Sequence, residues 1–420
     1  MIDRRDALAR LAAGAMAARF ARTPGALADH GAHRDPDDRV GAPLVPWRPG
    51  MLDIHHLATG RGDATLVVAP DGRTALIDAG AVTSDSPALV APQPDGARAP
   101  GEWIARHVQR RLRDTGARAM HSLVVTHLHA DHAGGVPGPV PLDPARHVPT
   151  GASDVARRVP VETLLDGDWP DYAVADAEDR RTAANHAAFA LERARNGQRN
   201  ARLVAGTTGQ VLPDAVVDGT PFTVRTLAAR GHVWTGTGTA RRDAFASRPA
   251  GDPPPTENAG SVALLIEYGA FRYAHFSDLT SWRDAGTRPW MDALTPAAAA
   301  CGRVTVAVLP HHGMFDGADN TVVATLAARA WIISAWHAAH PSLDVLERLY
   351  TPRLFDGARD VWSTALHPAA ALGMDRLVRR FVSRSGHVIC RVPGASGVPR
   401  VVVTRSDDER DTVTSVRVLA

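Results

Sequence analysis

Short apolar runs separated by polar turns recur along most of the chain. Residues 66–69 and 74–77 are mostly apolar and flank the turn Pro70-Asp71-Gly72, a pattern that predicts a β-hairpin. Two further strand-like runs follow, at 123–125 and 161–165. Two stretches, at 101–114 and 176–196, have helical spacing. The first half of the chain therefore interleaves strands with helices.

The second half has the same organisation without repeating the sequence. Residues 261–268 and 271–276 predict another hairpin, which turns at Gly269-Ala270. The other predicted elements are strands at 304–309, 330–334, 388–392 and 401–404 and a helix at 343–350. Because strands and helices alternate and both halves contain hairpins, we expect an α/β fold with two packed sheets.

Residues 1–28 carry features of an export signal. Arg4-Arg5 precedes an alanine-rich stretch, and Ala26-Leu27-Ala28 forms a small-residue cleavage site. The paired arginines resemble a twin-arginine signal, which predicts a mature protein in the periplasm or secreted from the cell. The alternative is a cytoplasmic amphipathic helix, because Arg10 interrupts the apolar run.

Residues 29–50 are rich in Pro, Gly, Asp and Arg and are predicted to be a linker, which leaves 51–420 as the folded domain. The formal net charge of +2 gives no strong electrostatic footprint for nucleic acid or an anionic membrane. No stretch reaches the ~20 apolar residues of a membrane span. Cys301 and Cys390 are too few for a disulfide framework, and a single bond between them stays open, as does the oligomeric state.

The residues with the clearest chemistry are His127, His129, Asp131 and His132, which fall within six positions directly after a strand-like run. In extended backbone the side-chain period is two, so His127 and His129 point the same way and can share one metal ion. Asp131 and His132 follow and can reach a second ion. Imidazole together with carboxylate suits Zn²⁺, with Mn²⁺ or iron as alternatives.

Two later strands also end in potential ligands. Asp278 follows the run 271–276, where its carboxylate can bridge two ions, and His311-His312 follows 304–309. We expect His312 to be the ligand and His311 to contact the reacting group, although the reverse assignment stays open. Together with the first cluster, these residues complete six donors for two divalent metal ions.

These motifs resemble those of a known superfamily. Residues 126–132 (THLHADH) match the signature of the metallo-β-lactamase superfamily. The resemblance extends to the hydrolase domain of ComEC-type competence proteins, through residues 60–65, 76–80, 261–278, 310–313 and 340–342.

The resemblance implies a four-layer αββα sandwich, with the metal ions at the edge between the two sheets. It also implies that Asp78 orients the ligand loop without binding a metal itself. Many members supply a third histidine to the first ion from the segment between His132 and Asp278. No such histidine stands out in this sequence, and the ComEC-like branch and choline-phosphate esterases also lack it. Asp166 is the candidate for an additional ligand.

The predicted function is a di-metal hydrolase that uses a metal-bound hydroxide, with Asp131 and His311 as catalytic residues. By resemblance to the ComEC-like branch, the expected substrate is a phosphodiester. Hydrolysis of a lactam, lactone or thioester by the same metal pair is the alternative, and a metal-binding module without turnover is a third hypothesis. The substrate can be a small molecule. Nucleic acid is not favoured, because arginine pairs such as Arg157-Arg158 are usually solvated surface.

Overall fold

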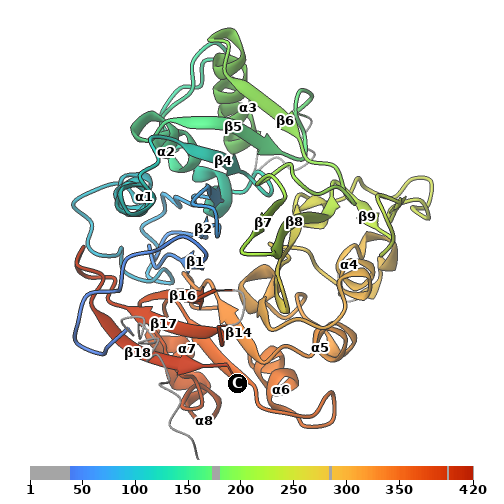
Figure 1. Cartoon of the computed structure of the whole chain (residues 1–420). Helices are drawn as coiled ribbons and strands as arrows, with labels where there is room; N and C mark the ends of the chain where they lie inside the picture. The colour runs from blue at the N-terminus through green and yellow to red at the C-terminus, as the bar shows by residue number, and fades with distance from the viewer. Residues whose placement is uncertain (1–37, 173–179, 283–285, 395–396, 420) are drawn as a thin grey trace, which may run out of the picture. The chain divides into compact units, whose positions relative to one another are not determined.

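Two β-sheets face each other in the computed structural model, which describes residues 38–172, 180–282, 286–394 and 397–419 (Figure 1). These residues fall in one compact unit, Asp38–Ala420. Within the described residues each sheet has nine strands. The first sheet has the order β18 (Val413–Val418), β17 (Arg400–Thr404), β16 (His387–Val392), β1 (Leu52–His56), β2 (Thr65–Val68), β3 (Thr74–Ile77), β4 (Met120–Val124), β5 (Val161–Asp166) and β6 (Arg199–Arg202).

The second sheet has the order β10 (Arg241–Asp243), β9 (His232–Trp234), β8 (Thr220–Ala229), β11 (Ala263–Tyr268), β12 (Phe271–His275), β13 (Val306–Val308), β14 (Ala330–Ile333) and β15 (Asp360–Ser363), and β7 (Ala215–Val217) pairs with β8. Both predicted hairpins, β2–β3 and β11–β12, form as antiparallel pairs. The ten-residue strand β8 was not predicted, although it joins β9 to β11 in the middle of this sheet.

Alternating side chains divide most of the buried apolar residues among three large cores. Ile77 of β3 and Ile332 of β14 point into the core between the two sheets. Their neighbours Leu76 and Trp331 point outward, into two further cores on the opposite faces of the sheets. This division follows from the two-residue period of a strand, which sends successive side chains to opposite faces.

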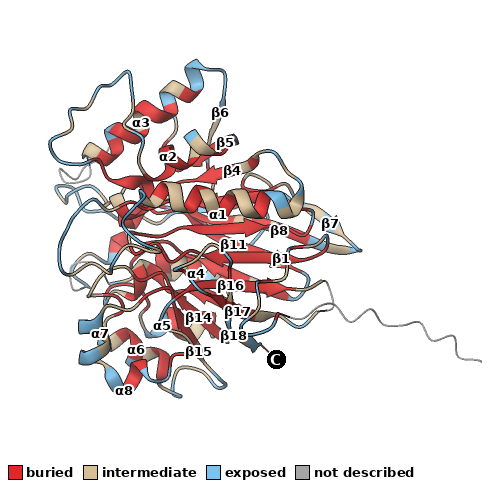
Figure 2. Ribbon diagram, turned by 90° about the vertical axis from the view of Figure 1, so that its left-hand side faces the viewer, coloured by how far each residue is buried: buried red, intermediate tan, exposed pale blue. Residues whose placement is uncertain are grey.

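Helices cover both outer faces. The core outside the first sheet contains residues of α1 (Pro100–Thr115), α2 (Gly151–Arg158) and α3 (Arg180–Arg195). The core outside the second sheet contains residues of α4 (Leu294–Cys301), α5 (Asn320–Leu326), α6 (Leu343–Tyr350) and α8 (Asp375–Val378), and α7 (Pro368–Gly373) precedes α8. Figure 2 shows that the strands are largely buried, whereas the helices are buried on one part of their surface and intermediate or exposed on the rest. The predicted four-layer αββα sandwich is confirmed.

The direction of the strands brings polar residues to one edge of the sandwich. Strands β3, β4 and β5 are parallel neighbours, and so are β12, β13, β14 and β15. Parallel neighbours end at the same edge of a sheet, so the residues after these strands lie together. They include Asp78 after β3, Thr126 after β4 and Asp278 after β12. The hydroxyls of Thr126 and Ser277 lie 2.7 Å apart, which joins this edge of one sheet to that of the other.

Part of the segment predicted as a linker packs on the first sheet. Asp38 is buried and accepts a hydrogen bond from Arg391 of β16 at 2.8 Å, and Trp47 is also buried. The export signal expected at 1–28 lies outside the described residues. Cys301 and Cys390 are both free and buried, in different cores, so they do not form a disulfide. In the part of the chain that the structure describes, no helix has the length and apolar character needed to cross a membrane.

Candidate metal centre

The ligand loop leaves β4 at the edge of the first sheet. Thr126 is fixed by Asp78, whose carboxylate accepts hydrogen bonds from the backbone N–H of Thr126 at 2.8 Å and from its hydroxyl at 2.7 Å. Leu128 is fully buried in the outer core, so the two residues beside it, His127 and His129, turn towards the second sheet. A short π-helix, Ala130–Gly134, follows and carries Asp131 and His132.

Two glycines allow the backbone to pass close to this loop. A Cβ at Gly80 would lie 2.0 Å from the carbonyl oxygen of Asp131, and one at Gly62 would lie 2.3 Å from the same atom. The backbone N–H of Asp63 donates to that oxygen at 2.8 Å. Segments 60–65 and 76–80 therefore clamp the loop at Asp131, which explains physically why both carry glycine.

The six predicted donors assemble into two groups that share one residue. His127, His129 and Asp278 form the first group, and Asp131, His132, Asp278 and His312 form the second; within each group the donor atoms lie within 4.8 Å of one another. Asp278 is the shared member. The arrangement can hold two divalent cations, one on each side of Asp278.

The donor atoms of the second group have the spacing that a small cation requires. His312 Nε2 lies 3.0 Å from Asp131 Oδ2 and 3.3 Å from His132 Nε2, and His132 Nε2 lies 3.3 Å from Asp278 Oδ2. Nitrogen and oxygen ligands at ~2.0–2.1 Å from a tetrahedral Zn²⁺ stand about 3.3 Å apart.

In the first group, His127 Nε2 is buried without a hydrogen-bond partner among the described residues and lies 3.8 Å from Asp278 Oδ2. A buried imidazole nitrogen that has no hydrogen-bond partner and lies beside a carboxylate is the arrangement expected of a metal ligand. The residues present therefore fit a divalent metal in both groups.

The electrostatics of the cluster favour bound cations. Burial alone would raise the pKa of Asp131 and Asp278, but the nearby imidazoles of His132 and His312 hold both carboxyl pKa values well below the ordinary range. Burial acts in the opposite sense on His312, and the carboxylates of Asp278 and Asp131 raise its pKa to about 10. His132 is also raised well above its ordinary pKa, against burial, by Asp278, Asp131 and Asp78. The carboxylates therefore favour positive charge at the imidazoles of the second group, and a divalent cation would supply such charge.

Each histidine of the second group is oriented through its other ring nitrogen. His132 Nδ1 donates to Asp78 Oδ2 at 2.8 Å, and His312 Nδ1 donates to the carbonyl oxygen of Ser334, after β14, also at 2.8 Å. Both Nε2 atoms are then left to face Asp131 and Asp278. Asp78 thus contacts His132 from the side away from the donors and lies outside both donor groups.

His311 and His312 occupy different positions although they are adjacent. Both have left-handed backbone, with φ of 50° and 52°, a conformation that is uncommon for residues other than glycine and clusters at functional sites. His312 joins the second donor group, whereas His311 lies beside the cluster with its Nε2 3.9 Å from Asp278 Oδ2. His311 Nδ1 lies 2.6 Å from Asp316 Oδ1, and the Asn258 amide donates to His311 Nε2 at 3.2 Å.

Asp166, the candidate for an additional metal ligand, lies outside the two donor groups. Its Oδ2 accepts from His186 Nε2 at 2.9 Å and from the Tyr172 hydroxyl at 2.8 Å, and it belongs to neither donor group. Among the described residues, the first group therefore contains two histidines and no third one.

Sequence reasoning missed a buried charge network beneath the ligand loop. Glu257 accepts from the backbone N–H of Leu128, between the two histidines of the first group, at 3.3 Å. Arg230 bonds Glu257 at 2.8 Å and Asp168 at 2.9 Å. The Arg230 side chain passes between Gly167 and Gly260. A Cβ added to Gly167 would lie 2.8 Å from this side chain, and one added to Gly260 would lie 2.7 Å from it. No local sequence signal links these distant charges.

A third cluster consists of His107, His387 and Asp411, whose donor atoms also lie within 4.8 Å of one another. There, however, the Arg110 guanidinium lies 3.1 Å from His107 Nδ1 and 3.2 Å from Asp411 Oδ1, and Arg111 also contacts Asp411. The positive charge is already provided by arginine, so the cluster is not assigned as a metal site.

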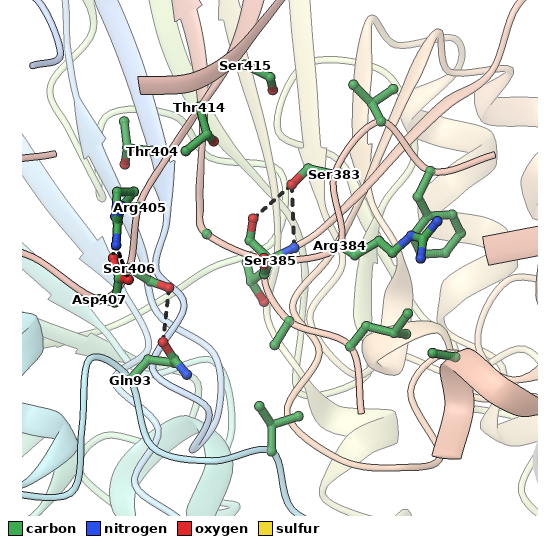
Figure 3. Close-up of a pocket in the computed structure, with 18 residues that line it drawn as sticks. Gln93, Ser383, Arg384, Ser385, Thr404, Arg405, Ser406, Asp407, Thr414 and Ser415 are labelled. Atoms are coloured by element: carbon green, nitrogen blue, oxygen red, sulfur yellow. Dashed lines mark hydrogen bonds and ion pairs between the residues drawn. The ribbon is translucent and has the colours of Figure 1, made fainter. Parts of the chain in front are cut away.

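One cavity, of about 950 Å³, has a lining that includes the polar side chains of Gln93, Ser383, Ser385, Arg405 and Thr414 (Figure 3). None of the six donors lines it. It is therefore distinct from the metal centre.

No family model and no curated protein matches the chain. Solved structures similar to it include a diphosphatase of the PhnP family (11% identity, 81% of this chain and 97% of that one, TM-score 0.32) and Zn²⁺-bound PqqB from Methylobacterium extorquens (11%, 81% and 99%, TM-score 0.32). Another is Tm1679, described as a metal-dependent hydrolase of the β-lactamase superfamily (13%, 74% and 95%, TM-score 0.33). These values are too low to support an argument about the site or the substrate.

Proposed function

We propose that the protein is a di-metal hydrolase of the metallo-β-lactamase type, and that it acts on phosphodiesters. The observation that carries the proposal is the pair of donor groups that share Asp278. Two divalent ions held there, which we propose to be Zn²⁺ with Mn²⁺ or iron as alternatives, would activate a water molecule at neutral pH and stabilise the negative charge that develops during hydrolysis.

The protein's own residues have separate roles in this proposal. Asp278 places one negative charge between the two groups, and Asp131 adds a second charge to the group that contains both His132 and His312. His311, held through Nδ1 by Asp316, directs Nε2 towards the edge of the cluster and is proposed to contact the transferred group or the leaving group.

The choice of a phosphodiester rests on the sequence resemblance to the ComEC-like branch at residues 60–80, 261–278 and 340–342. Acyl hydrolysis of a lactam, lactone or thioester would use the same metal pair and remains the alternative. We also propose, from the Arg4-Arg5 pattern alone, that the mature protein is periplasmic or secreted.

The test combines metal analysis with a substrate panel of bis-(p-nitrophenyl) phosphate, nitrocefin and a lactone. We expect close to two equivalents of transition metal and metal-dependent hydrolysis of the phosphodiester. His129→Ala should abolish hydrolysis and at least one metal equivalent. The matched control is His121→Ala, because His121 lies at the opposite end of β4, half-buried and paired with Glu162.

Hydrolysis of nitrocefin or the lactone alone would overturn the substrate class while leaving the metal centre intact. A His129→Ala protein that keeps its full metal content would overturn the ligand assignment itself.

A further inference from the structure

Two exposed aromatic side chains, Trp282 and Phe315, pack against each other on the surface of the protein. Trp282 and Phe315 are each 44% exposed, and their rings pack edge to face with centroids 6.0 Å apart. Among the described residues, no other phenylalanine, tyrosine or tryptophan is exposed. Aromatic side chains that are exposed together, next to each other, form a surface patch that is a candidate for ligand contact.

The pair belongs to the two loops that carry the site. Trp282 follows Asp278 by four residues, and Phe315 follows His311 by four. The two loops are joined at Asp316, whose carbonyl oxygen accepts from the backbone N–H of Ser281 at 3.0 Å and of Trp282 at 3.4 Å. The side chain of the same aspartate contacts His311. Asp316 therefore links the two aromatic loops to His311, which lies beside the donor groups.

The indole of Trp282 is held in place on this surface. A Cβ added to Gly286 would lie 2.8 Å from Trp282 Nε1, so the glycine backbone packs directly against the ring, and Phe315 supports it from another side. A ring that is positioned in this way loses little conformational entropy when a ligand stacks on it.

Among the described residues, Arg348 contacts the loop that carries Phe315. It donates to the carbonyl oxygens of Phe315 and Ala318 and is paired with Asp344. The two rings themselves offer a ligand stacking and apolar contact, whereas a phosphoryl group would be held at the donor cluster.

We propose that Trp282 and Phe315 bind an aromatic ring of the substrate, so that the natural substrate is a phosphate ester with an aromatic or nucleobase-like group near the reacting phosphorus. This inference rests on the proposed function. The probes that test it are phenylphosphonate and methylphosphonate, which share an anionic head group and differ by the ring.

Binding of both probes is measured by calorimetry on the metal-loaded and the chelator-treated full-length protein. We expect metal-dependent binding of both, with phenylphosphonate about 5- to 30-fold tighter, from the ~1–2 kcal/mol that ring stacking typically contributes. Trp282→Ala should remove most of this preference and leave methylphosphonate binding unchanged, whereas Trp282→Phe should retain much of it. Leu372→Ala, at a residue 84% exposed on α7, is the control.

Each contrary result has a distinct meaning. Equal, metal-dependent binding of the two probes, or a preference that survives Trp282→Ala, would refute the aromatic site and leave the proposed function standing. No metal-dependent binding of either probe would refute both. A change of molar mass in solution caused by Trp282→Ala would show that the pair is a protein interface, and the proposal would be wrong.

Discussion

Replacing Asp78 by asparagine should weaken metal binding by reversing one buried hydrogen bond. Asp78 Oδ2 accepts from His132 Nδ1 at 2.8 Å, and both side chains are fully buried. An asparagine NH₂ at this position cannot accept that proton. His132 would then have to carry its proton on Nε2, the atom that faces Asp131 and Asp278, where it would compete with a metal ion.

The backbone should tolerate this change. Asp78 has a φ of 60°, a conformation that asparagine adopts as readily as aspartate does. The remaining amide oxygen can still accept from the backbone N–H of Thr126, as Asp78 Oδ1 does now at 2.8 Å. The substitution therefore changes only the contacts of Oδ2, which are those with His132 Nδ1 and with the Thr126 hydroxyl.

Loss of such an outer contact typically weakens metal binding about 10- to 100-fold, which corresponds to about 1.4–2.7 kcal/mol. We expect Asp78→Asn to lose this much affinity for one of two equivalents, measured by competition with a chromophoric chelator. Asp71→Asn, in the exposed turn of the same hairpin, is the matched control. Unchanged affinity for both equivalents in Asp78→Asn would mean that Asp78 does not orient a metal ligand.

Two further substitutions test the site and its surroundings. Asp278→Asn removes the charge shared by both donor groups, so it should release one metal equivalent. It should also lower turnover by more than the ~100-fold that is typical when an outer contact is lost. If the variant keeps two metal ions and normal turnover, the bridging donor is another residue. Burial raises the pKa of Asp168 to about 6 despite the attraction of Arg230, so the folded protein binds this proton between about pH 4 and 6 while the unfolded chain releases it. The unfolding free energy should therefore fall by up to about 3 kcal/mol as pH rises through that window. Asp168→Asn should remove this pH dependence, which a series of urea unfolding curves at different pH values measures. Identical pH profiles for the two proteins would refute the role of Asp168.

Local patterns were sufficient for much of the fold. The hairpins β2–β3 and β11–β12, helix α1 and strand β5 follow from apolar periodicity and turn residues, which act within a few positions of the chain. Strand β8 was missed because it begins at Thr220-Pro221 and alternates with threonine and arginine. Its buried face becomes apparent only when β9 and β11 pair with it.

The sequence by itself determined the chemistry that is local. The order His-x-His-x-Asp-His places four donors on one loop whatever the rest of the chain does, because extended backbone repeats its side-chain direction every two residues. It also indicated that later strands end in Asp278 and in two adjacent histidines.

Only the tertiary structure decided how these pieces meet. His132 and His312 are 180 residues apart in sequence, yet their Nε2 atoms lie 3.3 Å apart because β4 and β13 end at the same edge of facing sheets. The same packing assigns His312 to the cluster, places Asp316 behind His311 and sets Arg230 between two carboxylates. These contacts depend on strand order and register, which side-chain periodicity along the chain does not specify.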